Sequence, residues 1–202
     1  MMTIAVFASG KGSNFDAIVR AVKRGACAVR IGLLVCDQPS AGVLKKAKRH
    51  KVPIALVRRE DFSSKSDFEK KIIEECQSAG ATLIVLAGFM RIVGADLISA
   101  YKDRIINIHP ALLPSFKGAH GIRDAFEHGV KVTGVTVHFV DEAMDNGPVI
   151  LQASVAVNED DTLKTLEEKI HKIEHKIYPK AIALIAAGAV SIKGRKVSVS
   201  RP

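Results

Sequence analysis

Short apolar runs alternate with amphipathic segments through the first half of the chain. Five apolar runs have the length of buried strands, and they cover residues 3–8, 30–37, 52–57, 82–88 and 104–109. The segments between them have the apolar spacing of helices, at residues 14–24, 41–50, 66–78 and 95–102. Strands that alternate with helices predict an α/β fold with a doubly wound, mostly parallel sheet and right-handed crossovers.

The pattern changes after Pro110. Residues 134–140 and 149–157 alternate apolar and polar positions, as half-buried antiparallel strands do. A helix is predicted near residues 120–128, and a long amphipathic helix at residues 160–188, which Pro179 would kink or split. Residues 190–200 predict a terminal hairpin that turns at Gly194. We expect both halves of the chain to share one sheet.

One of the predicted helices has a specific N-terminal capping signal. Ser66 followed by Glu69 has the spacing of a capping box, in which the two side chains satisfy free amides of the first turn. This predicts a helix that begins at Ser66 and continues to about Ser78. Gly80 is well placed to end it.

The composition is that of a globular protein. The chain has 202 residues, of which 48% are hydrophobic and 25% charged, so it can bury a core. No apolar run approaches the ~18 residues of a membrane span, and the N-terminus lacks the basic region of a signal peptide. Cys27, Cys36 and Cys76 form no metal-binding or disulfide pattern, so we expect buried free thiols and a cytoplasmic protein.

The net charge of +9 suggests an acidic partner, either nucleic acid or small anions drawn to a basic cleft. The basic residues are scattered over helix-like segments and the tail at residues 193–202, which is typical of solvated helix faces. Only 5% of the residues are aromatic and none is Trp, which argues against a surface that stacks single-stranded bases.

The sequence SGKGSN at residues 9–14 lies between the first strand and the first helix, where ligands bind in open α/β sheets. Glycines there let backbone amides approach an anion, and the helix N-terminus favours negative charge. Asp37 ends the second strand, where a dinucleotide-binding protein has a ribose-binding acid. The third glycine of that motif is Phe15 here, so the turn predicts a single phosphate and not a pyrophosphate.

Asn107 and His109 are two residues apart at the end of a predicted strand. Residues i and i+2 of a strand share a face, so both side chains should project from one side of the sheet. An amide can donate to a developing oxyanion, and a histidine can donate a proton or supply positive charge. The pair alone is weak evidence, because a strand-end histidine is often only packed.

Four motifs together identify a family resemblance. NIHPALLPSFKG at 107–118, LAGFMRI at 86–92, HFVDEAMDNGPVILQ at 138–152 and SGKGSN occur in the order found in the glycinamide ribonucleotide (phosphoribosylglycinamide) formyltransferases, which are folate-dependent formyltransferases of purine synthesis. The resemblance covers essentially the whole chain. It implies a Rossmann-like formyltransferase domain over residues 1–202, with a phosphate-binding half at 1–100 and a folate-binding, catalytic half at 101–202.

The resemblance also implies the ligands. The enzyme would transfer the formyl group of 10-formyltetrahydrofolate, a co-substrate, to the amine of glycinamide ribonucleotide without a metal. We expect small-molecule partners, no nucleic acid or membrane, and a monomer or homodimer. Some family members have two glycines after the catalytic aspartate, where this chain has Asn146 and Gly147.

Each site residue is carried over from the family by position. The catalytic residues would be Asn107, His109 and Asp145. The nucleotide phosphate and ribose would be bound by Gly12, Ser13, Asn14 and Glu174. The folate would be bound by Asn107 and Asp145 together with Lys65, Met90, Arg91, Ile92, Val93, His138, Asp141, Glu142, Ala143 and Met144. A carboxylate beside His109 favours the charged imidazolium and fixes its orientation, and Asp145 is the candidate.

Three alternatives stay open. HKIEH at 171–175 matches the inverted zinc-protease pattern, but a third metal ligand is not evident. A formyltetrahydrofolate hydrolase or methionyl-tRNA formyltransferase would share the same core, but we expect the first to carry an added N-terminal domain and the second a C-terminal one. The third alternative, motivated by the net charge, is a non-catalytic nucleotide- or RNA-binding module.

Overall fold

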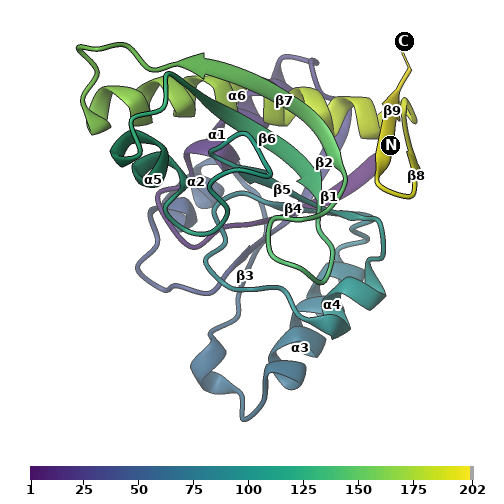
Figure 1. The fold of residues 1–202 in the computed structure, drawn as a ribbon. Coiled ribbons are helices and arrows are strands. Elements are labelled where there is room, and N and C mark those ends of the chain that lie inside the picture. The colour runs from purple at the N-terminus through teal and green to yellow at the C-terminus, as the bar shows by residue number, and fades with distance from the viewer. Residues whose placement is uncertain (201–202) are drawn as a thin grey trace. The chain divides into compact units, whose positions relative to one another are not determined.

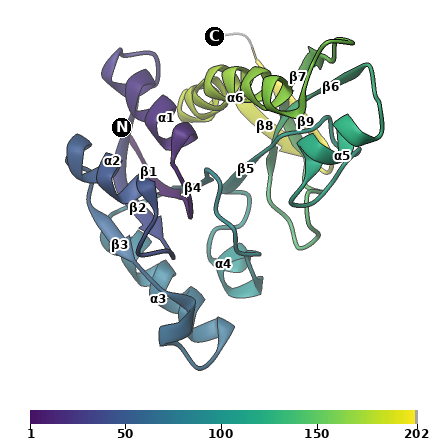
Figure 2. The same ribbon diagram turned by 90° about the vertical axis from the view of Figure 1, so that its left-hand side faces the viewer.

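The structure is a computed structural model that describes residues 1–200, and it is shown in two views in Figure 1 and Figure 2. Arg201 and Pro202, the end of the predicted basic tail, lie outside the described residues. The chain forms two compact units, Met1–Ile106 and Asn107–Pro202.

The first unit contains every strand and helix predicted for it. Its elements are β1 (Met2–Phe7), α1 (Ser13–Lys23), β2 (Val29–Cys36), α2 (Gly42–His50), β3 (Ile54–Leu56), the short 3₁₀ helix η1 (Arg59–Asp61), α3 (Lys65–Ser78), β4 (Leu83–Leu86) and α4 (Ala95–Ala100). β5 (Ile105–His109) begins in this unit and ends in the second.

The sheet of the first unit is parallel, with the strand order β3-β2-β1-β4. Residues 4–8 of β1 and its exit are fully buried, as expected for a parallel strand covered on both faces. Because all four strands run the same way, their carboxyl ends meet at one edge. The glycine turn, Asp37 and the LAGFMRI turn all follow strands at this edge.

The predicted capping box of α3 is wrong in register. The N-cap is Ser64, whose side-chain oxygen accepts a hydrogen bond from the Asp67 amide at 3.0 Å, and Ser66 lies inside the helix. Ser64 has the extended conformation that a cap requires, so the N-cap lies two residues before the predicted one. The Glu69 side chain is therefore not part of the α3 cap, and it binds the backbone amides of Gly94 and Leu97 instead.

The second unit contains the antiparallel part of the fold. Its elements are α5 (Gly121–Glu127), β6 (Val132–Phe139), β7 (Val149–Ala156), α6 (Leu163–Ala186), β8 (Val190–Lys193) and β9 (Lys196–Val199). β6 and β7 pair antiparallel, and their register shifts between Val137 and His138. Such irregularities redirect side chains, and this one is beside His138. The terminal hairpin turns through Gly194 with a positive φ of 59°, as predicted.

The long helix α6 is not split at Pro179, which lies within it. A capping box between Thr162 and Thr165 fixes its start. The helix packs against β6, β7 and α5, and it buries Leu166, Ile170, Tyr178 and Ile182 completely. Burial of these apolar side chains stabilises the helix against the sheet.

The predicted architecture is confirmed: a mostly parallel sheet with flanking helices comes first, and antiparallel strands follow in the C-terminal half. All three cysteines are buried free thiols, as expected. Burial raises the pKa of Cys27 to about 11 and that of Cys76 to about 12, so both stay protonated. Within residues 1–200, no helix is long and apolar enough to cross a bilayer.

Candidate active site

The glycine turn of the first unit is shaped by α2. Gly12 is the N-cap of α1 and has the left-handed φ of 71°. A Cβ on Gly12 would lie 2.5 Å from Cγ2 of Val43, so the position has room only for glycine. The Val43 amide donates to the Gly10 carbonyl at 3.1 Å, and the Lys46 ammonium donates to the Gly12 carbonyl at 3.2 Å. Ser13 is the first residue of α1 and Asn14 is buried. The start of a helix favours negative charge in general, so the prediction of a phosphate at this turn stays a prediction.

The LAGFMRI turn presents apolar side chains outward. Met90 is 74% exposed and Ile92 is 69% exposed, which is unusual for large apolar residues unless a ligand covers them. The turn is nevertheless held in place by two hydrogen bonds to the neighbouring strand ends. The Met90 amide donates to Ser9 Oγ at 2.9 Å, and the Arg91 Nε donates to Asp37 at 2.8 Å.

Glu69 fixes the other end of this turn. Its buried carboxylate accepts from the Gly94 amide at 2.6 Å and from the Leu97 amide at 3.2 Å, and so caps α4. Lys65 lies one helical turn away, with its ammonium 3.8 Å from Glu69 and half of its side chain exposed. Val93 lies within the anchored segment. The predicted folate residues of this unit are therefore the anchored segment from Met90 to Val93, in which Met90 and Ile92 are exposed, and Lys65 on the neighbouring helix.

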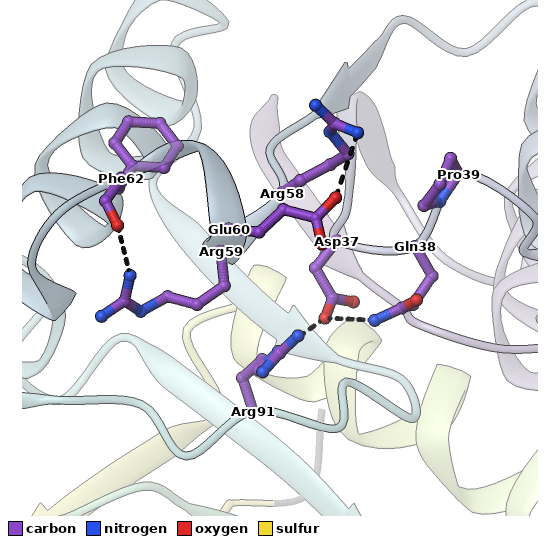
Figure 3. Close-up of a pocket in the computed structure, with 8 residues that line it drawn as sticks. All are labelled: Asp37, Gln38, Pro39, Arg58, Arg59, Glu60, Phe62 and Arg91. Carbon is purple, nitrogen blue, oxygen red and sulfur yellow. Dashed lines mark hydrogen bonds and ion pairs between the residues drawn. The ribbon is translucent and has the colours of Figure 1, made fainter.

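A polar pocket of 380 Å³ lies beside the same turn (Figure 3). Its lining residues are Asp37, Gln38, Pro39, Arg58, Arg59, Glu60, Phe62 and Arg91. Asp37 is buried at the end of β2. Although burial alone would raise the pKa of Asp37, hydrogen bonding with Ser9, Arg91 and Gln38 lowers it below its ordinary value, so the carboxylate is charged and holds Arg91 in place.

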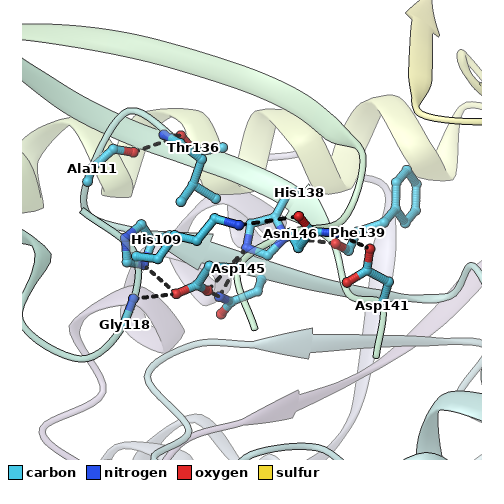
Figure 4. Close-up of polar contacts among 12 residues, drawn as sticks. His109, Ala111, Gly118, Thr136, His138, Phe139, Asp141, Asp145 and Asn146 are labelled. Carbon is cyan, nitrogen blue, oxygen red and sulfur yellow. Dashed lines mark hydrogen bonds and ion pairs between the residues drawn. The ribbon is translucent and has the colours of Figure 1, made fainter. Parts of the chain in front are cut away.

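In the second unit, Asp145 lies at the centre of a polar cluster (Figure 4). Its Oδ2 is 3.4 Å from Nδ1 of His109 and accepts from the Gly118 amide at 2.8 Å. Its Oδ1 is 3.5 Å from Nδ2 of Asn107 and 3.7 Å from Nε2 of His138. Asp145 has a left-handed φ of 50°, which is uncommon outside glycine and is a typical sign of a functional position.

The prediction that Asn107 and His109 project together is consistent with this cluster, because both side chains reach Asp145. The ring of His109 is buried, and its Nε2 donates to the Phe116 carbonyl at 2.7 Å. A carbonyl only accepts, so Nε2 carries a hydrogen. Nδ1 faces the Asp145 carboxylate, so the two ring nitrogens lie against a carbonyl on one side and a carboxylate on the other.

His138 fixes the amide of Asn107. Burial lowers the pKa of His138 below its ordinary value of 6.5, so the ring is neutral near pH 7. Its Nδ1 must donate to the Phe139 carbonyl, which lies 2.7 Å away. Nε2 is then an acceptor, and it accepts from Nδ2 of Asn107 at 3.3 Å. The amide NH₂ of Asn107 is thereby turned toward Asp145.

The loop at residues 141–147 holds Asp145 in place. Asp141 accepts from the Ala143 amide at 3.1 Å and from the Asn146 side chain at 3.2 Å, whereas Glu142 and Met144 are exposed. Lys117 donates to the Asn146 side chain at 3.2 Å. A Cβ on Gly147 would lie 1.9 Å from the Phe139 carbonyl. Only the second of the two positions therefore requires glycine, and Asn146 adds hydrogen bonds at the first.

Glu174 is buried on α6, and its carboxylate is 2.9 Å from Nδ1 of His171. The rings of His171 and His175 stack with their centroids 6.4 Å apart. Within residues 1–200, no group of three or more histidine, cysteine, aspartate or glutamate side chains is arranged to hold a metal ion.

Sequence reasoning missed the residues that support the site. Ser9 and Glu69 anchor the LAGFMRI turn, and the Gly118 amide and Phe116 carbonyl hold Asp145 and His109. Ser9 belongs to the SGKGSN motif and could have been found from it. Phe116 and Gly118 lie in the NIHPALLPSFKG motif, but they contact the site through backbone groups, so their residue types do not indicate the role. Glu69 reaches the turn across a sequence separation of 25 residues, which no local pattern indicates.

Comparisons with known proteins agree with the motifs. The formyl transferase family model matches residues 2–182. The chain is 48% identical over 182 residues to the phosphoribosylglycinamide formyltransferase of Bacillus subtilis, covering 90% of this chain and 93% of that protein. It is also 36% identical over 189 residues to the human trifunctional purine biosynthetic protein adenosine-3, of which it spans 19%.

Solved structures are similar over the whole chain. The glycinamide ribonucleotide transformylase 1 of Symbiobacterium toebii has a TM-score of 0.97 and 41% identity, with 100% of this chain and 95% of that chain covered. A formyltetrahydrofolate deformylase of Pseudomonas syringae has a TM-score of 0.92 at 23% identity, with 99% of this chain and 66% of that chain covered, and it supports the fold alone.

Proposed function

The chain belongs to the formyl transferase family, and from this we propose that it transfers the formyl group of 10-formyltetrahydrofolate to the amine of glycinamide ribonucleotide, a step of de novo purine biosynthesis. The observation that supports this chemistry most directly is the position of Asp145, whose carboxylate is within 3.5 Å of both the Asn107 amide and the His109 ring. The three residues combine a neutral donor, a charged donor and a base.

The reaction needs no covalent enzyme intermediate. The substrate amine attacks the formyl carbon, and the carbonyl oxygen becomes an oxyanion. Asn107 and His109 donate to this oxyanion, which receives stronger hydrogen bonds than the neutral formyl oxygen does. The bond from the formyl carbon to N10 of the folate then breaks, and the proton lost by the amine is delivered to N10. Asp145 is the base through which that proton passes.

In the structure without substrate, Asn107 and His109 already donate hydrogen bonds to other acceptors, and an oxyanion would have to replace those acceptors. The bond from Asn107 to Asp145 is long, at 3.5 Å, and is easily exchanged for a stronger acceptor. His109 Nε2 is bonded to the Phe116 carbonyl at 2.7 Å, so an oxyanion that uses this nitrogen has to displace that carbonyl. Phe116 has a left-handed φ of 51°, a strained conformation that lowers the cost of moving it.

We assign the ligand contacts by unit. In the first unit, the turn at Gly12, Ser13 and Asn14 binds the nucleotide phosphate, and Lys65 with Met90, Arg91, Ile92 and Val93 binds the folate. In the second, Glu174 accepts ribose hydroxyls, and His138 with Asp141, Glu142, Ala143 and Met144 encloses the folate. All partners are then small molecules in the cytoplasm, and the protein acts as a monomer or homodimer.

An absorbance assay tests the function. Folate release from a 10-formylfolate donor should depend on glycinamide ribonucleotide, because the amine is the nucleophile. Release that is equally fast without the nucleotide would instead identify a hydrolase. Steeply salt-dependent RNA binding with no folate-dependent activity would support the non-catalytic alternative.

A further inference from the structure

The terminal hairpin, formed by β8 and β9, adds little to the core of the second unit. None of residues 190–199 is buried, and the hairpin forms a two-stranded sheet of its own beside β7. An isolated two-stranded hairpin is at best marginally stable, so core packing does not explain this element. It also lies beyond residues 2–182, which the formyl transferase model matches. Its role must therefore come from what it contacts.

The turn of the hairpin holds one charged side chain at its tip. The turn consists of Gly194 and Arg195, between the paired residues Lys193 and Lys196. Gly194 has the positive φ that is typical of the first position in a two-residue hairpin turn, so the strand pairing fixes the backbone of Arg195. Nη2 of Arg195 donates to the carbonyl oxygen of Asn146 at 2.7 Å, across 49 residues of sequence. A charged donor makes a stronger hydrogen bond than a neutral one does.

Asn146 directly follows Asp145 in the loop between β6 and β7 (Figure 4). The side chain of Asn146 is bound at both of its polar atoms, because its oxygen accepts from Lys117 at 3.2 Å and its nitrogen donates to Asp141 at 3.2 Å. The hydrogen bond from Arg195 adds the backbone carbonyl. The residue after Asp145 is therefore fixed through its side chain and its backbone.

Asp145 needs such support because its backbone is strained. Its φ of 50° is in the left-handed region, where a residue other than glycine stays only if the surrounding contacts hold it. Relaxation of this φ would move the carboxylate away from the Asn107 amide at 3.5 Å and the His109 ring at 3.4 Å. Arg195 holds the chain one residue beyond the strained position, so its hydrogen bond opposes that movement.

We propose that Arg195 is a positioning residue for formyl transfer, which holds the loop so that the Asp145 carboxylate stays beside Asn107 and His109. This inference rests on the proposed function. Arg195 has no assigned contact with either substrate and acts on the reaction through Asn146. Its loss should therefore slow the chemical step more than it weakens glycinamide ribonucleotide, whose proposed phosphate and ribose contacts lie outside this loop.

The test replaces Arg195 by methionine, which keeps a long side chain and removes its donors. Arg195→Met should lower kcat about tenfold, since misplacement of a reacting group by about 1 Å can cost about 10²-fold. The KM for glycinamide ribonucleotide should stay within about twofold of its normal value. Hydrogen exchange, followed by mass spectrometry, should become faster at the amides of residues 141–147 and stay unchanged in α6. Arg195→Lys should lose less activity, because one nitrogen makes the bond and an ammonium can also donate it.

Lys196→Met is the matched control, because it removes the same charge from the next residue of the hairpin, which is also exposed. It should keep a normal kcat and normal exchange in the loop. A normal kcat in Arg195→Met, an equal loss in Lys196→Met or Arg195→Lys, or a loss without faster exchange would overturn the inference. If the unmodified protein forms no formylated nucleotide from any folate donor, the proposed function itself fails. The exchange measurement needs no activity, so the two failures are distinguishable.

Discussion

Asp145 is the residue on which most of the polar cluster depends. Asp145→Asn keeps the size of the side chain but removes the charge that His109 faces at 3.4 Å. We expect kcat to fall roughly 10²–10³-fold, in the range found when one oxyanion donor is lost, with much smaller changes in the KM values. Steady-state kinetics with both substrates measures this.

The double mutant Asp145→Asn with His109→Ala shows whether the two residues act as a unit. If they serve one oxyanion and one proton path, the combined loss in kcat should be well below the product of the single losses. Losses that simply multiply, or near-normal turnover in His109→Ala, would contradict the mechanism.

His138 makes a separate prediction about pH. Its pKa in the folded protein is below 6.5, so between these values the unfolded chain binds more protons than the folded one. Stability then rises with pH in this window, which means that the contribution is complete above pH 6.5 and is lost as the pH falls through the folded pKa. Urea unfolding of the unmodified protein should show this loss, and His138→Gln should show less of it. Identical pH dependence in both would exclude His138 as the source.

At the scale of elements, the glycine turn depends on α2 beneath it. Gly12→Ala places a methyl group against Val43 and imposes a left-handed φ on alanine, so we expect a loss of about 1–3 kcal/mol in the unfolding free energy. The KM for the nucleotide should rise while that for the folate stays nearly constant. Gly10→Ala is the control, since nothing lies within 4 Å of its Cβ position. If the KM for the folate rises instead, the turn does not bind the nucleotide phosphate and the proposed assignment is wrong.

The start of α3 tests a correction to the sequence prediction. Ser64→Ala removes the cap that accepts from the Asp67 amide, and it should cost about 1 kcal/mol of unfolding free energy. Ser66→Ala removes the serine that the sequence indicated, and it should cost much less because Ser66 is inside the helix. Denaturant unfolding of both variants decides between the two caps, and an equal or larger cost for Ser66→Ala would favour the original register.

The elements were predictable because their signals are local. Apolar runs, the alternation in β6 and β7, and Gly194 in the hairpin each lie within a few residues, and the structure has each element close to its predicted ends. The α3 cap was misplaced because Ser64 and Ser66 are equally good residues, and a capping pattern does not specify which of them is extended. The expected break at Pro179 did not occur, because α6 continues through that residue. A proline in the sequence does not by itself specify whether a helix ends there.

At the scale of the molecule, the motif order predicted the family, and the family match confirms it. The catalytic residues were carried over by position, and the structure brings Asn107, His109, His138 and Asp145 into one cluster. The residues that orient this cluster, such as Phe116 and Gly118, could not be predicted. Their contribution is a backbone group, which every residue type has, and only the folded chain brings it near the site.

The net charge of +9 leads to a prediction for the whole enzyme. Both proposed substrates are anions, one through its phosphate and the other through its glutamyl carboxylates, so the positive field should raise their association rates. Salt shortens the range of that field, to about 10 Å at about 0.1 M. We expect kcat/KM for each substrate to fall several-fold between about 0.02 M and about 0.5 M salt. At saturating substrate, kcat should stay nearly constant, because the chemical step occurs in a cluster whose histidines are buried. If kcat/KM does not respond to salt, the excess charge is unrelated to substrate capture, and an equal fall in kcat would indicate damage to the protein itself.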